Sequence, residues 1–525
     1  MKKIIFIVTT LLLVGELSAQ QLHAWVYFTD KPQEQAFLDN PTTMLTQRAL
    51  DRKQRHGITL DERDVPMNQT YVATIKQQTG IDYRTQSKWN NCVHVVGQFE
   101  DIEALNNLDF VERVDYADQS KSASQIELNQ FKEDLDPPLD YGSATNQIEM
   151  IALDELHDAG HIGTDVIIAV TDSGFPGVDT NTAFEQMRSN RNLLGGYDFV
   201  DGDESIYGNN FHGARVLSIM GASRDTQFEG SAPDASYYLY RTEDETSETP
   251  VEMSYWVAAA ERADSLGVDV VNVSLGYLQF ANDNESLTYE DMNGSSFISR
   301  GAEIAAAKGL LVVTSAGNFG RVNSYPYIAA PADADGVFTI GSVTANESKS
   351  DFSSIGPTFD GRIKPDVVAQ GSSTILINES DDLRSGNGTS YSSPVIAGAM
   401  ASLVGAFPDR TPQELMEAVR QSATQADNPD NQLGYGIPDF GAVFNTLSND
   451  FVQQPKDFKY YVRSNILTIV AGDISVSKVS IFNLQGQLLL NNATGKSSFD
   501  LNTLSSGIYI VALNDGLNSF KIVID

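Results

Sequence analysis

The sequence lacks the features on which several common kinds of protein depend. Only one of its 525 residues, Cys92, is a cysteine, so no disulfide can form within the chain. No stretch beyond the N-terminus is apolar for long enough to form a transmembrane helix. Basic residues are also few, with 35 Lys and Arg against 70 Asp and Glu, a formal net charge of −35. Such a surface repels nucleic acid, so we expect no nucleic-acid partner and no transmembrane segment.

The N-terminus has the pattern of a secretory signal peptide. Two lysines precede an apolar run from Ile4 to Val14, and small and polar residues follow near Ala19. The run is too short to span a membrane. We therefore predict a signal peptide over residues 1–20 and export from the cytoplasm. Without disulfides, stability outside the cell has to come from a large core, for which a 41% apolar composition suffices, and from any bound cations.

The next segment, residues 21–117, mixes strand and helix patterns. Strand patterns occur at His23–Asp30, Val93–Glu100 and Val111–Ala117, and helical patterns occur at Tyr71–Gly80 and Asp101–Leu108. The mixture predicts a small α+β unit. A polar, acidic stretch with two adjacent prolines follows over residues 118–145, and this composition predicts a linker.

From about Asn146 the pattern changes to buried strands separated by helices. Continuous apolar runs occur at Asp165–Asp172, Val268–Gly276, Gly309–Asn318 and Gly336–Val343, and helical periodicity occurs at Ser254–Gly267 and Ser299–Gly309. Strands that are apolar on both faces and alternate with helices predict an α/β fold with a parallel sheet. An active site in such a sheet lies beyond the carboxyl ends of its strands.

After the parallel-sheet domain, the sequence pattern predicts a short linker and a small all-β domain. We assign residues 146–447 to the parallel-sheet domain and residues 448–457, which include Val452–Asp457, to the linker. Residues 458–525 contain strand patterns every eight to twelve residues, separated by Gly and Asn turns. This spacing is typical of a β-sandwich.

Three polar residues of the parallel-sheet domain stand at strand ends or helix starts. Asp172 lies in VTDSG, His212 in NNFHGARVLSIMGA and Ser390 in NGTSYSSPVIAGAMA. Each has an ordinary structural explanation by itself, as a turn residue or a helix cap. Together they follow the order Asp, His, Ser, which is one of the known orders of a nucleophilic triad.

Six segments, in the same order, resemble the motifs of subtilisin-like serine proteases. VTDSG, HGARV and GTSYSSPVIAG resemble the three signature motifs, and GSAPDA, VVNVSLG and TSAGN resemble the blocks between them. The resemblance covers about Asn146 to Leu447 and implies a subtilisin-like sheet flanked by helices. It also implies that Asp172, His212 and Ser390 form a catalytic triad.

The chemistry of a serine endopeptidase suits these residue types. A serine hydroxyl is a weak nucleophile until a base such as His212 takes its proton, and Asp172 would orient the imidazole. The resemblance also implies that Asn318, with the Ser390 backbone N–H, forms the oxyanion hole. Protein or peptide substrates are expected. No cofactor is required for the chemistry, while a structural calcium ion is compatible with the family and with so acidic a chain.

Two segments resemble the walls of the family's primary specificity pocket. They are Ser274, Leu275 and Gly276 in the first segment, and Ala316 and Gly317 in the second. An extended peptide could pair with their backbone by strand addition. The structural alternative is that both are ordinary buried strand ends.

The residues after Ser390 depart from the family pattern. Many members have Met-Ala-Ser-Pro-His there, whereas this chain has Tyr391-Ser392-Ser393-Pro394-Val395. We expect these positions to affect packing without removing the triad. Pro394 is predicted to fall in the first turn of the helix, where its missing N–H is harmless.

The flanking regions also resemble known domains. Residues 93–117 resemble the inhibitory propeptide of the same family, a ferredoxin-like unit that acts as folding chaperone and intramolecular inhibitor. The alternative is a stable accessory domain. KVSIFNLQGQLLL and LSSGIYIVALNDG resemble the C-terminal sorting domain of type IX secretion in Bacteroidetes, which implies export by that machinery through the periplasm to the cell surface or medium. The alternative is a carbohydrate- or surface-binding sandwich, which would need exposed aromatic side chains for stacking. Tyr509 alternates with Ile508 and Ile510 and could face either way.

Two other function classes fit the sequence less well. An esterase of the α/β-hydrolase type needs the order Ser, Asp, His and a Gly-x-Ser-x-Gly turn, whereas this chain has the order Asp, His, Ser and has Ser392 where the second glycine would stand. A catalytically silent surface-binding protein would not need a complete triad and Asn318. A secreted, self-processed serine endopeptidase is therefore the predicted function.

Overall fold

The computed structural model describes the chain except for its ends and several short gaps. The described residues are 21–118, 142–224, 226–244, 246–453, 458–463, 465–471, 478–483, 486–493, 498–513 and 518–524. The predicted signal peptide and most of the predicted acidic linker lie outside these ranges. The chain divides into two compact units between Ala442 and Val443. Within the described ranges, no helix has the length and apolarity needed to cross a membrane.

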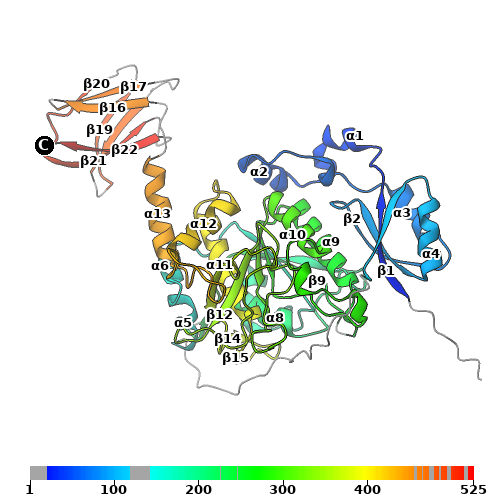
Figure 1. Cartoon of the computed structure of the whole chain (residues 1–525). Helices are drawn as coiled ribbons and strands as arrows, with labels where there is room; N and C mark the ends of the chain where they lie inside the picture. The colour runs from blue at the N-terminus through cyan, green and yellow to red at the C-terminus, as the bar shows by residue number, and fades with distance from the viewer. Residues whose placement is uncertain are drawn as a thin grey trace, which may run out of the picture. The chain divides into compact units, whose positions relative to one another are not determined.

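The N-terminal region forms a four-stranded antiparallel sheet in the order β2-β3-β1-β4 (Figure 1). Its elements are β1 (Leu22–Phe28), α3 (Gln69–Lys76), β2 (Ile81–Ser87), β3 (Cys92–Gly97), α4 (Phe99–Ala104) and β4 (Val111–Tyr116). This βαββαβ order is that of a ferredoxin-like unit, so the predicted α+β fold is confirmed. The apolar side chains of both helices and of the inner strands make its core, among them Val26, Ile75 and Val95.

The segment between β1 and α3 contains helices that the apolar pattern does not predict. They are α1 (Glu34–Leu38) and α2 (Gln47–Arg55), with short 3₁₀ turns η1 (Pro41–Thr43) and η2 (Glu62–Asp64). Thr46 caps α2 by accepting a hydrogen bond from the Ala49 N–H. Its sequence, QRALDRKQR, has almost no apolar face, and the side chains that it buries include those of Arg52 and Lys53. Tertiary contacts must therefore stabilise this helix.

A seven-stranded parallel sheet in the order β13-β12-β11-β10-β5-β9-β6 confirms the predicted α/β fold. Its strands are β5 (Ile167–Asp172), β6 (Leu193–Asp198), β9 (Ser236–Arg241), β10 (Val270–Val273), β11 (Leu311–Ser315), β12 (Phe338–Val343) and β13 (Val367–Gln370). The side chains of the central strands are almost fully buried, as their continuous apolar runs require.

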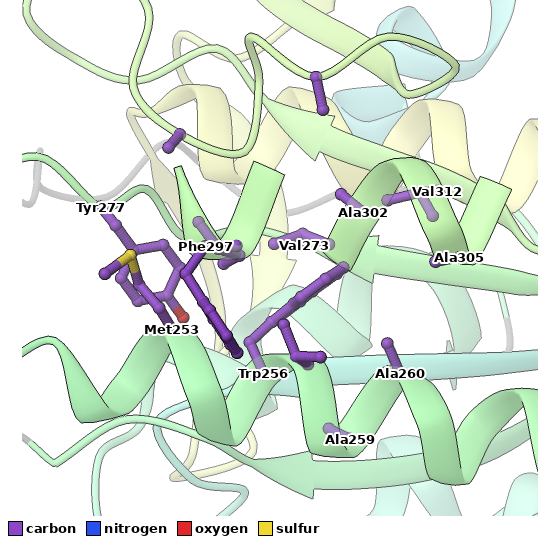
Figure 2. Close-up of a cluster of buried hydrophobic side chains, with 14 of the residues drawn as sticks. Met253, Trp256, Ala259, Ala260, Val273, Tyr277, Phe297, Ala302, Ala305 and Val312 are labelled. Atoms are coloured by element: carbon purple, nitrogen blue, oxygen red, sulfur yellow. The ribbon is translucent and has the colours of Figure 1, made fainter. Parts of the chain in front are cut away.

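Helices pack against this sheet. Those that contact its strands include α8 (His212–Gly221), α9 (Val251–Leu266), α10 (Phe297–Ala307) and α11 (Thr389–Ala406). Figure 2 shows Trp256 of α9 and Phe297 at the start of α10 packed with Val273 and Val312 of the sheet. Small residues on the facing sides of the helices, such as Ala260 and Ala302, allow the close packing. The other helical segments are α5 (Gly142–Glu149), α6 (Leu153–Asp158), η4 (Thr182–Phe184), α7 (Glu185–Ser189), η5 (Asp283–Glu285), η6 (Tyr289–Asp291), α12 (Pro412–Ser422) and α13 (Phe440–Gln453). Two short antiparallel strand pairs are also present, β7 (Ser223–Arg224) with β8 (Phe228–Glu229) and β14 (Thr374–Ile377) with β15 (Leu383–Gly386).

The C-terminal region consists of two antiparallel sheets, as predicted for a β-sandwich. One contains β16 (Phe458–Arg463), β17 (Ile466–Ala471) and β20 (Ser498–Asp500), and the other β18 (Lys478–Phe482), β19 (Leu488–Ala493), β21 (Gly507–Leu513) and β22 (Asn518–Ile524). Leu467 of one sheet shares a core with Ile481 and Val511 of the other. Tyr509 is buried, and its hydroxyl donates to the Ser505 carbonyl at 2.7 Å, so its ring is not exposed for stacking on a sugar.

Candidate active site

Asp172 is the last residue of β5, near the middle of the parallel sheet. Its side chain is fully buried. The Oδ1 atom accepts hydrogen bonds from the Ser173 backbone N–H at 2.8 Å and from the Ser173 hydroxyl at 3.1 Å. These donors replace hydrogen bonds to water that the side chain loses on burial. As the last residue of its strand, Asp172 lies on the side of the sheet formed by the carboxyl ends of the strands, where a ligand site is expected.

His212 is the first residue of α8 and pairs with Asp172. Its Nδ1 atom lies 2.9 Å from Oδ1 and 3.0 Å from Oδ2 of the carboxylate. Asn210 fixes the start of the helix by accepting the His212 N–H at 2.7 Å. Gly213 permits the close approach, because a Cβ atom there would lie 2.4 Å from the Gly174 carbonyl oxygen. The His-Gly pair in the motif thus has a steric reason.

Ser390 is the second residue of α11 and is 2% exposed. Its Oγ atom is buried and makes no hydrogen bond with any residue that the structure describes. The next side chain, Tyr391, lies beside His212 with ring centroids 5.8 Å apart. An unpaired buried hydroxyl is costly in a native fold and calls for an explanation. The N-terminal position also places this hydroxyl at the helix end that favours negative charge.

Pro394 occupies the second turn of α11, so its predicted place in the first turn is wrong. The helix begins at Thr389, five residues before Pro394, and proline here removes the N–H that would bond to the Ser390 carbonyl. The Ser274 hydroxyl donates to that carbonyl instead, at 2.9 Å. Asn272 in turn donates to the Ser274 Oγ at 2.9 Å. The end of β10 therefore satisfies the backbone group that proline leaves open.

Asn318 follows β11 and is held by the first residue of α11. The Thr389 backbone N–H and hydroxyl donate to Asn318 Oδ1 at 2.9 Å and 3.1 Å. The Gly317 N–H donates to the Thr389 hydroxyl at 3.1 Å. Because Oδ1 accepts two hydrogen bonds, the Nδ2 group of the amide is the part available to donate elsewhere. The side chain of Asn318, the predicted oxyanion donor, is thus held in one orientation by Thr389, the residue that precedes Ser390.

The predicted pocket segments lie at the ends of the neighbouring strands β10 and β11. Ser274 and Ala316 are buried, Leu275 and Gly317 are half-buried, and Gly276 is exposed. The Ser315 hydroxyl donates to the Leu275 carbonyl at 3.4 Å, a long bond that connects the two segments. Ser274 also supports α11, a contact that its motif did not predict.

Two acidic residues that sequence reasoning missed stand close to this edge. The Thr242 N–H donates to the Asp172 carbonyl at 2.9 Å, and the next residue is Glu243. Burial raises the pKa of the Glu243 carboxyl to about 8. Burial also raises the pKa of Glu252, to about 10, and the nearby carboxylate of Glu243 adds to this shift. Tyr277 donates its hydroxyl to Glu243. Protonated carboxyls here avoid further negative charge beside Asp172. No local motif identifies them, because their burial depends on the fold.

No metal centre is evident in the part of the chain that the structure describes. Within it, no group of three or more His, Cys, Asp or Glu side chains could hold a metal ion. The acidic turn after β6 has a cation of its own, because Arg241 pairs with Asp198 at 2.7 Å and with Asp201 at 2.8 Å. A structural calcium ion remains a prediction from the family resemblance.

Comparisons with known families match three consecutive parts of the chain. The family model of the Subtilase family matches residues 163–436. The model of the peptidase S8 propeptide domain of Bacteroidota matches residues 23–133. The model of the secretion system C-terminal sorting domain matches residues 463–525. The order is the one predicted from the sequence.

Individual relatives agree with the family match. Subtilisin DY of Bacillus licheniformis is 28% identical over 278 residues, which cover 53% of this chain and 90% of the relative. Subtilisin NAT of Bacillus subtilis subsp. natto is 26% identical over 309 residues, which cover 58% and 72%. The structure of the epidermin leader peptide processing serine protease EpiP from Staphylococcus aureus has the same fold, with a TM-score of 0.56, 15% identity and coverage of 82% of this chain and 99% of that chain. The chain thus belongs to the subtilase family of serine endopeptidases, with a propeptide domain before the peptidase and a secretion sorting domain after it.

Proposed function

We propose that the mature protein hydrolyses peptide bonds through an acyl-enzyme formed on Ser390. The observation that carries the proposal is a buried carboxylate–imidazole pair at the sheet edge, beside a helix whose buried serine hydroxyl has no partner among the described residues. In this role Ser390 is the nucleophile and His212 the general base and acid. Asp172 orients His212.

The proposed proton transfers start from the contact between His212 and Asp172. The His212 Nδ1–H donates to Asp172, which leaves Nε2 as the basic atom that takes the proton of Ser390 Oγ. The Oγ–carbon bond forms, and the same proton then passes from Nε2 to the leaving amine as the peptide bond breaks. Water repeats the sequence to release the acid and regenerate the hydroxyl. Asp172 stabilises the transient imidazolium and stays ionised throughout.

We assign the oxyanion hole to Asn318 Nδ2 and the Ser390 backbone N–H. Both donors belong to rigid parts of the fold, since Thr389 holds the amide and the N–H lies in the first turn of α11. Donors fixed before the reaction stabilise the developing charge without reorganisation, and one such donor is worth about 10²–10³ in turnover.

The segments Ser274–Gly276 and Ala316–Gly317 are proposed to hold the substrate. Their position at the ends of β10 and β11, next to the residues that contact α11, supports this assignment. An extended peptide pairing with the half-exposed backbone of Leu275 and Gly276 would bring its carbonyl towards Ser390. This arrangement suits an unfolded or loop segment of a protein substrate.

The maturation pathway is part of the proposal. The signal peptide (residues 1–20) would direct the chain to the periplasm, and the propeptide (21–117) would inhibit the peptidase (146–447) until the chain cuts itself in the linker (118–145). The sorting domain, residues 458–525 after the short linker 448–457, would then pass the protein to the type IX machinery for release or surface display. The order of the three matched domains supports this pathway.

Casein hydrolysis by a Ser390→Ala variant tests the proposal. We expect no detectable hydrolysis and a precursor that keeps its propeptide. Ser402→Ala is the matched control, because Ser402 is another buried serine of α11 whose hydroxyl bonds only weakly to the Ser231 carbonyl, at 3.4 Å. Turnover by Ser390→Ala at the rate of the control would refute the assignment.

A further inference from the structure

The propeptide region contacts the peptidase at two separate places. Its sheet packs on α9 and α10, where Trp25 stacks on Phe297 with centroids 4.7 Å apart and Ser87 donates to Glu261 at 2.7 Å. The second place is formed by residues 46–64, which comprise α2, η2 and the turn between them. We call this segment the anchor. The anchor contacts the peptidase at the C-terminal ends of α9 and α10.

The anchor and the candidate active site lie at opposite ends of the parallel strands. We call the side where the strands begin the amino edge and the side where they end the carboxyl edge. In this fold α9 ends at Leu266 and leads into the start of β10 at Val270, and α10 ends at Ala307 and leads into the start of β11 at Leu311. The anchor therefore contacts the amino edge of the parallel sheet. Asp172 stands at the carboxyl edge, so changes in the anchor need not disturb the catalytic geometry.

The anchor fits the two helix ends closely. Arg48 Nε donates to the Gly267 carbonyl at 3.0 Å, and the Thr46 N–H donates to the Ser265 carbonyl at 2.9 Å. A Cβ atom on Gly267 would lie 2.8 Å from the Ala49 nitrogen, and one on Gly309 would lie 2.5 Å from a methyl group of Ile58. Cations suit helix C-termini because the last carbonyls carry partial negative charge.

Five charged side chains are buried where the anchor meets the peptidase. The anchor supplies Arg52, Lys53 and Asp64, and the peptidase supplies Asp264 and Lys308, each no more than 2% exposed. Asp264 pairs with Arg52 at 2.5 Å and with Lys53 at 2.8 Å. Lys308 pairs with Asp64 at 2.7 Å. Each side thus presents a charge that the other side neutralises.

The charged side chains in this contact depend on one another, so the loss of one of them should weaken the binding of the anchor to the peptidase. Burial lowers the pKa of Lys53, so this ammonium depends on Asp264 and Asp64 to remain charged. Burial alone would raise the pKa of Asp64, but Lys53 and Lys308 outweigh it and hold that pKa below its usual value. Removing Lys53 leaves Asp264 paired with Arg52 and Asp64 paired with Lys308, but it takes away a buried hydrogen bond between charged groups at 2.8 Å, and bonds of this kind contribute more than neutral ones.

We infer that the anchor holds the propeptide on the peptidase after the linker is cut and thereby determines how long the new enzyme stays latent. The inference rests on the proposed self-processing. Once the linker is cut, the propeptide is retained only by non-covalent contacts, and the duration of binding depends mainly on the dissociation rate. The buried ion pairs have to be broken in that step.

Retention of the cut propeptide in a Lys53→Met variant tests this inference. The full chain is allowed to process itself, the complex is diluted, and the lag before hydrolysis of a peptide substrate is measured. We expect the lag to shorten about 30-fold or more, with the final rate unchanged. Arg55→Met is the matched control, because Arg55 is an exposed cation of the same helix, and its lag should equal that of the parent.

The outcomes separate the two proposals. If the parent chain never cuts its linker, the proposed self-processing is wrong. If Lys53→Met cuts its linker and keeps the parental lag, the anchor does not control latency. Should Lys53→Met fail to fold, hydrogen exchange of the full-length Ser390→Ala chain decides. The amides of residues 49–56 must then exchange as slowly as those of β3, and exchange within seconds would overturn the inference.

Discussion

The two edges of the parallel sheet are built from different interactions. At the carboxyl edge, neutral hydroxyl and amide groups support two of the reacting residues, as when Ser274 supports Ser390 and Thr389 holds Asn318. A carboxylate, that of Asp172, contacts His212 there. At the amino edge, charged groups neutralise each other across the contact between the anchor and the peptidase, as Lys53 and Asp264 do. The first edge keeps the Ser390 hydroxyl without a partner among the described residues. The second pairs its buried charges, although two guanidinium nitrogens of Arg52 and one oxygen of Asp64 make no hydrogen bond within the described part of the chain.

This difference separates chemistry from assembly. A neutral hydrogen bond that orients a reacting group changes the barrier of a reaction more than the stability of the fold. A buried ion pair between two parts of a chain changes their affinity and adds nothing to a reaction that occurs elsewhere. Substitutions at the carboxyl edge should therefore lower turnover, and substitutions in the propeptide contact should alter retention and stability of the precursor.

The largest effect is expected from Asp172→Asn. The asparagine amide cannot stabilise the imidazolium and favours the wrong tautomer of His212, so kcat should fall about 10⁴-fold while the melting temperature changes little. Asp179→Asn, the same substitution at an exposed position seven residues along the chain, is the control. Steady-state kinetics on a chromogenic peptide measures the effect. A loss below tenfold would remove the main distinction between the two edges.

Asn318→Leu should have the next largest effect. It removes one oxyanion donor while filling a similar volume, so kcat should fall about 10²–10³-fold with little change in KM. Thr389→Val, which removes the hydroxyl bound to Asn318 Oδ1 and keeps the amide, should cause a smaller loss. Equal losses in both variants would show that positioning, not donation, is the role of Asn318.

A stability test sharpens the comparison at Ser274. Ser274→Ala leaves the buried Ser390 carbonyl without its donor, which should lower the free energy of unfolding by about 1–3 kcal/mol. Adding Pro394→Ala restores a backbone N–H one turn along the helix, so the double variant should recover part of the loss. Chemical denaturation in the Ser390→Ala background, where no self-digestion occurs, measures both. A double variant less stable than the single one would contradict the account of Pro394.

The smallest effect concerns a histidine pair in the propeptide contact. His23 Nδ1 and His94 Nε2 are 2.9 Å apart, a space for one proton, and His94 Nδ1 lies 2.8 Å from the Ser254 hydroxyl of α9. Burial, with Arg84 adding to it, lowers the pKa of His23 to about 4 and that of His94 well below its usual value. Because the unfolded chain then binds more protons, the pair's contribution to stability is complete above about pH 6.5 and is lost as the pH falls towards 4.

His94→Gln should therefore flatten the pH dependence of the precursor. We expect the melting temperature of the Ser390→Ala chain to fall by more between pH 7 and pH 4.5 than that of the same chain with His94→Gln. Glu285, whose pKa burial raises to about 7, has a contribution of the opposite sign, but it is present in both proteins and cancels in the difference. Parallel pH profiles would show that the pair does not need to stay neutral.

The strand and helix ends that carry the predicted site residues can be located from the sequence because their determinants are local. The apolar run that ends at Asp172 identifies a buried strand, and the parallel sheet then brings its end to the same edge as those of the other strands. The glycine after His212 and the small residues around Ser390 form recognisable motifs for steric reasons that the structure makes explicit. The prediction for Pro394 is wrong because the helix starts at Thr389, five residues before it, and the residue at which a helix begins is poorly determined by sequence pattern.

The anchor could not be predicted from the sequence. α2 has no apolar periodicity, and it buries Arg52 and Lys53, residue types that a pattern assigns to the surface. Their partner Asp264 is distant in the sequence and belongs to a helix whose own pattern indicates only packing against the sheet. Likewise, the raised pKa of Glu243 results from burial that only the folded chain creates.

The most direct test of the triad is the site of covalent labelling by a fluorophosphonate. The reagent phosphonylates an activated serine with loss of fluoride, so peptide mapping of the mature protein should find the adduct on Ser390 and on no other serine. The labelling rate should fall at least about 10²-fold in a His212→Ala variant. An unlabelled Ser390 in a preparation that still cleaves casein, or an adduct on a different serine, would contradict the account.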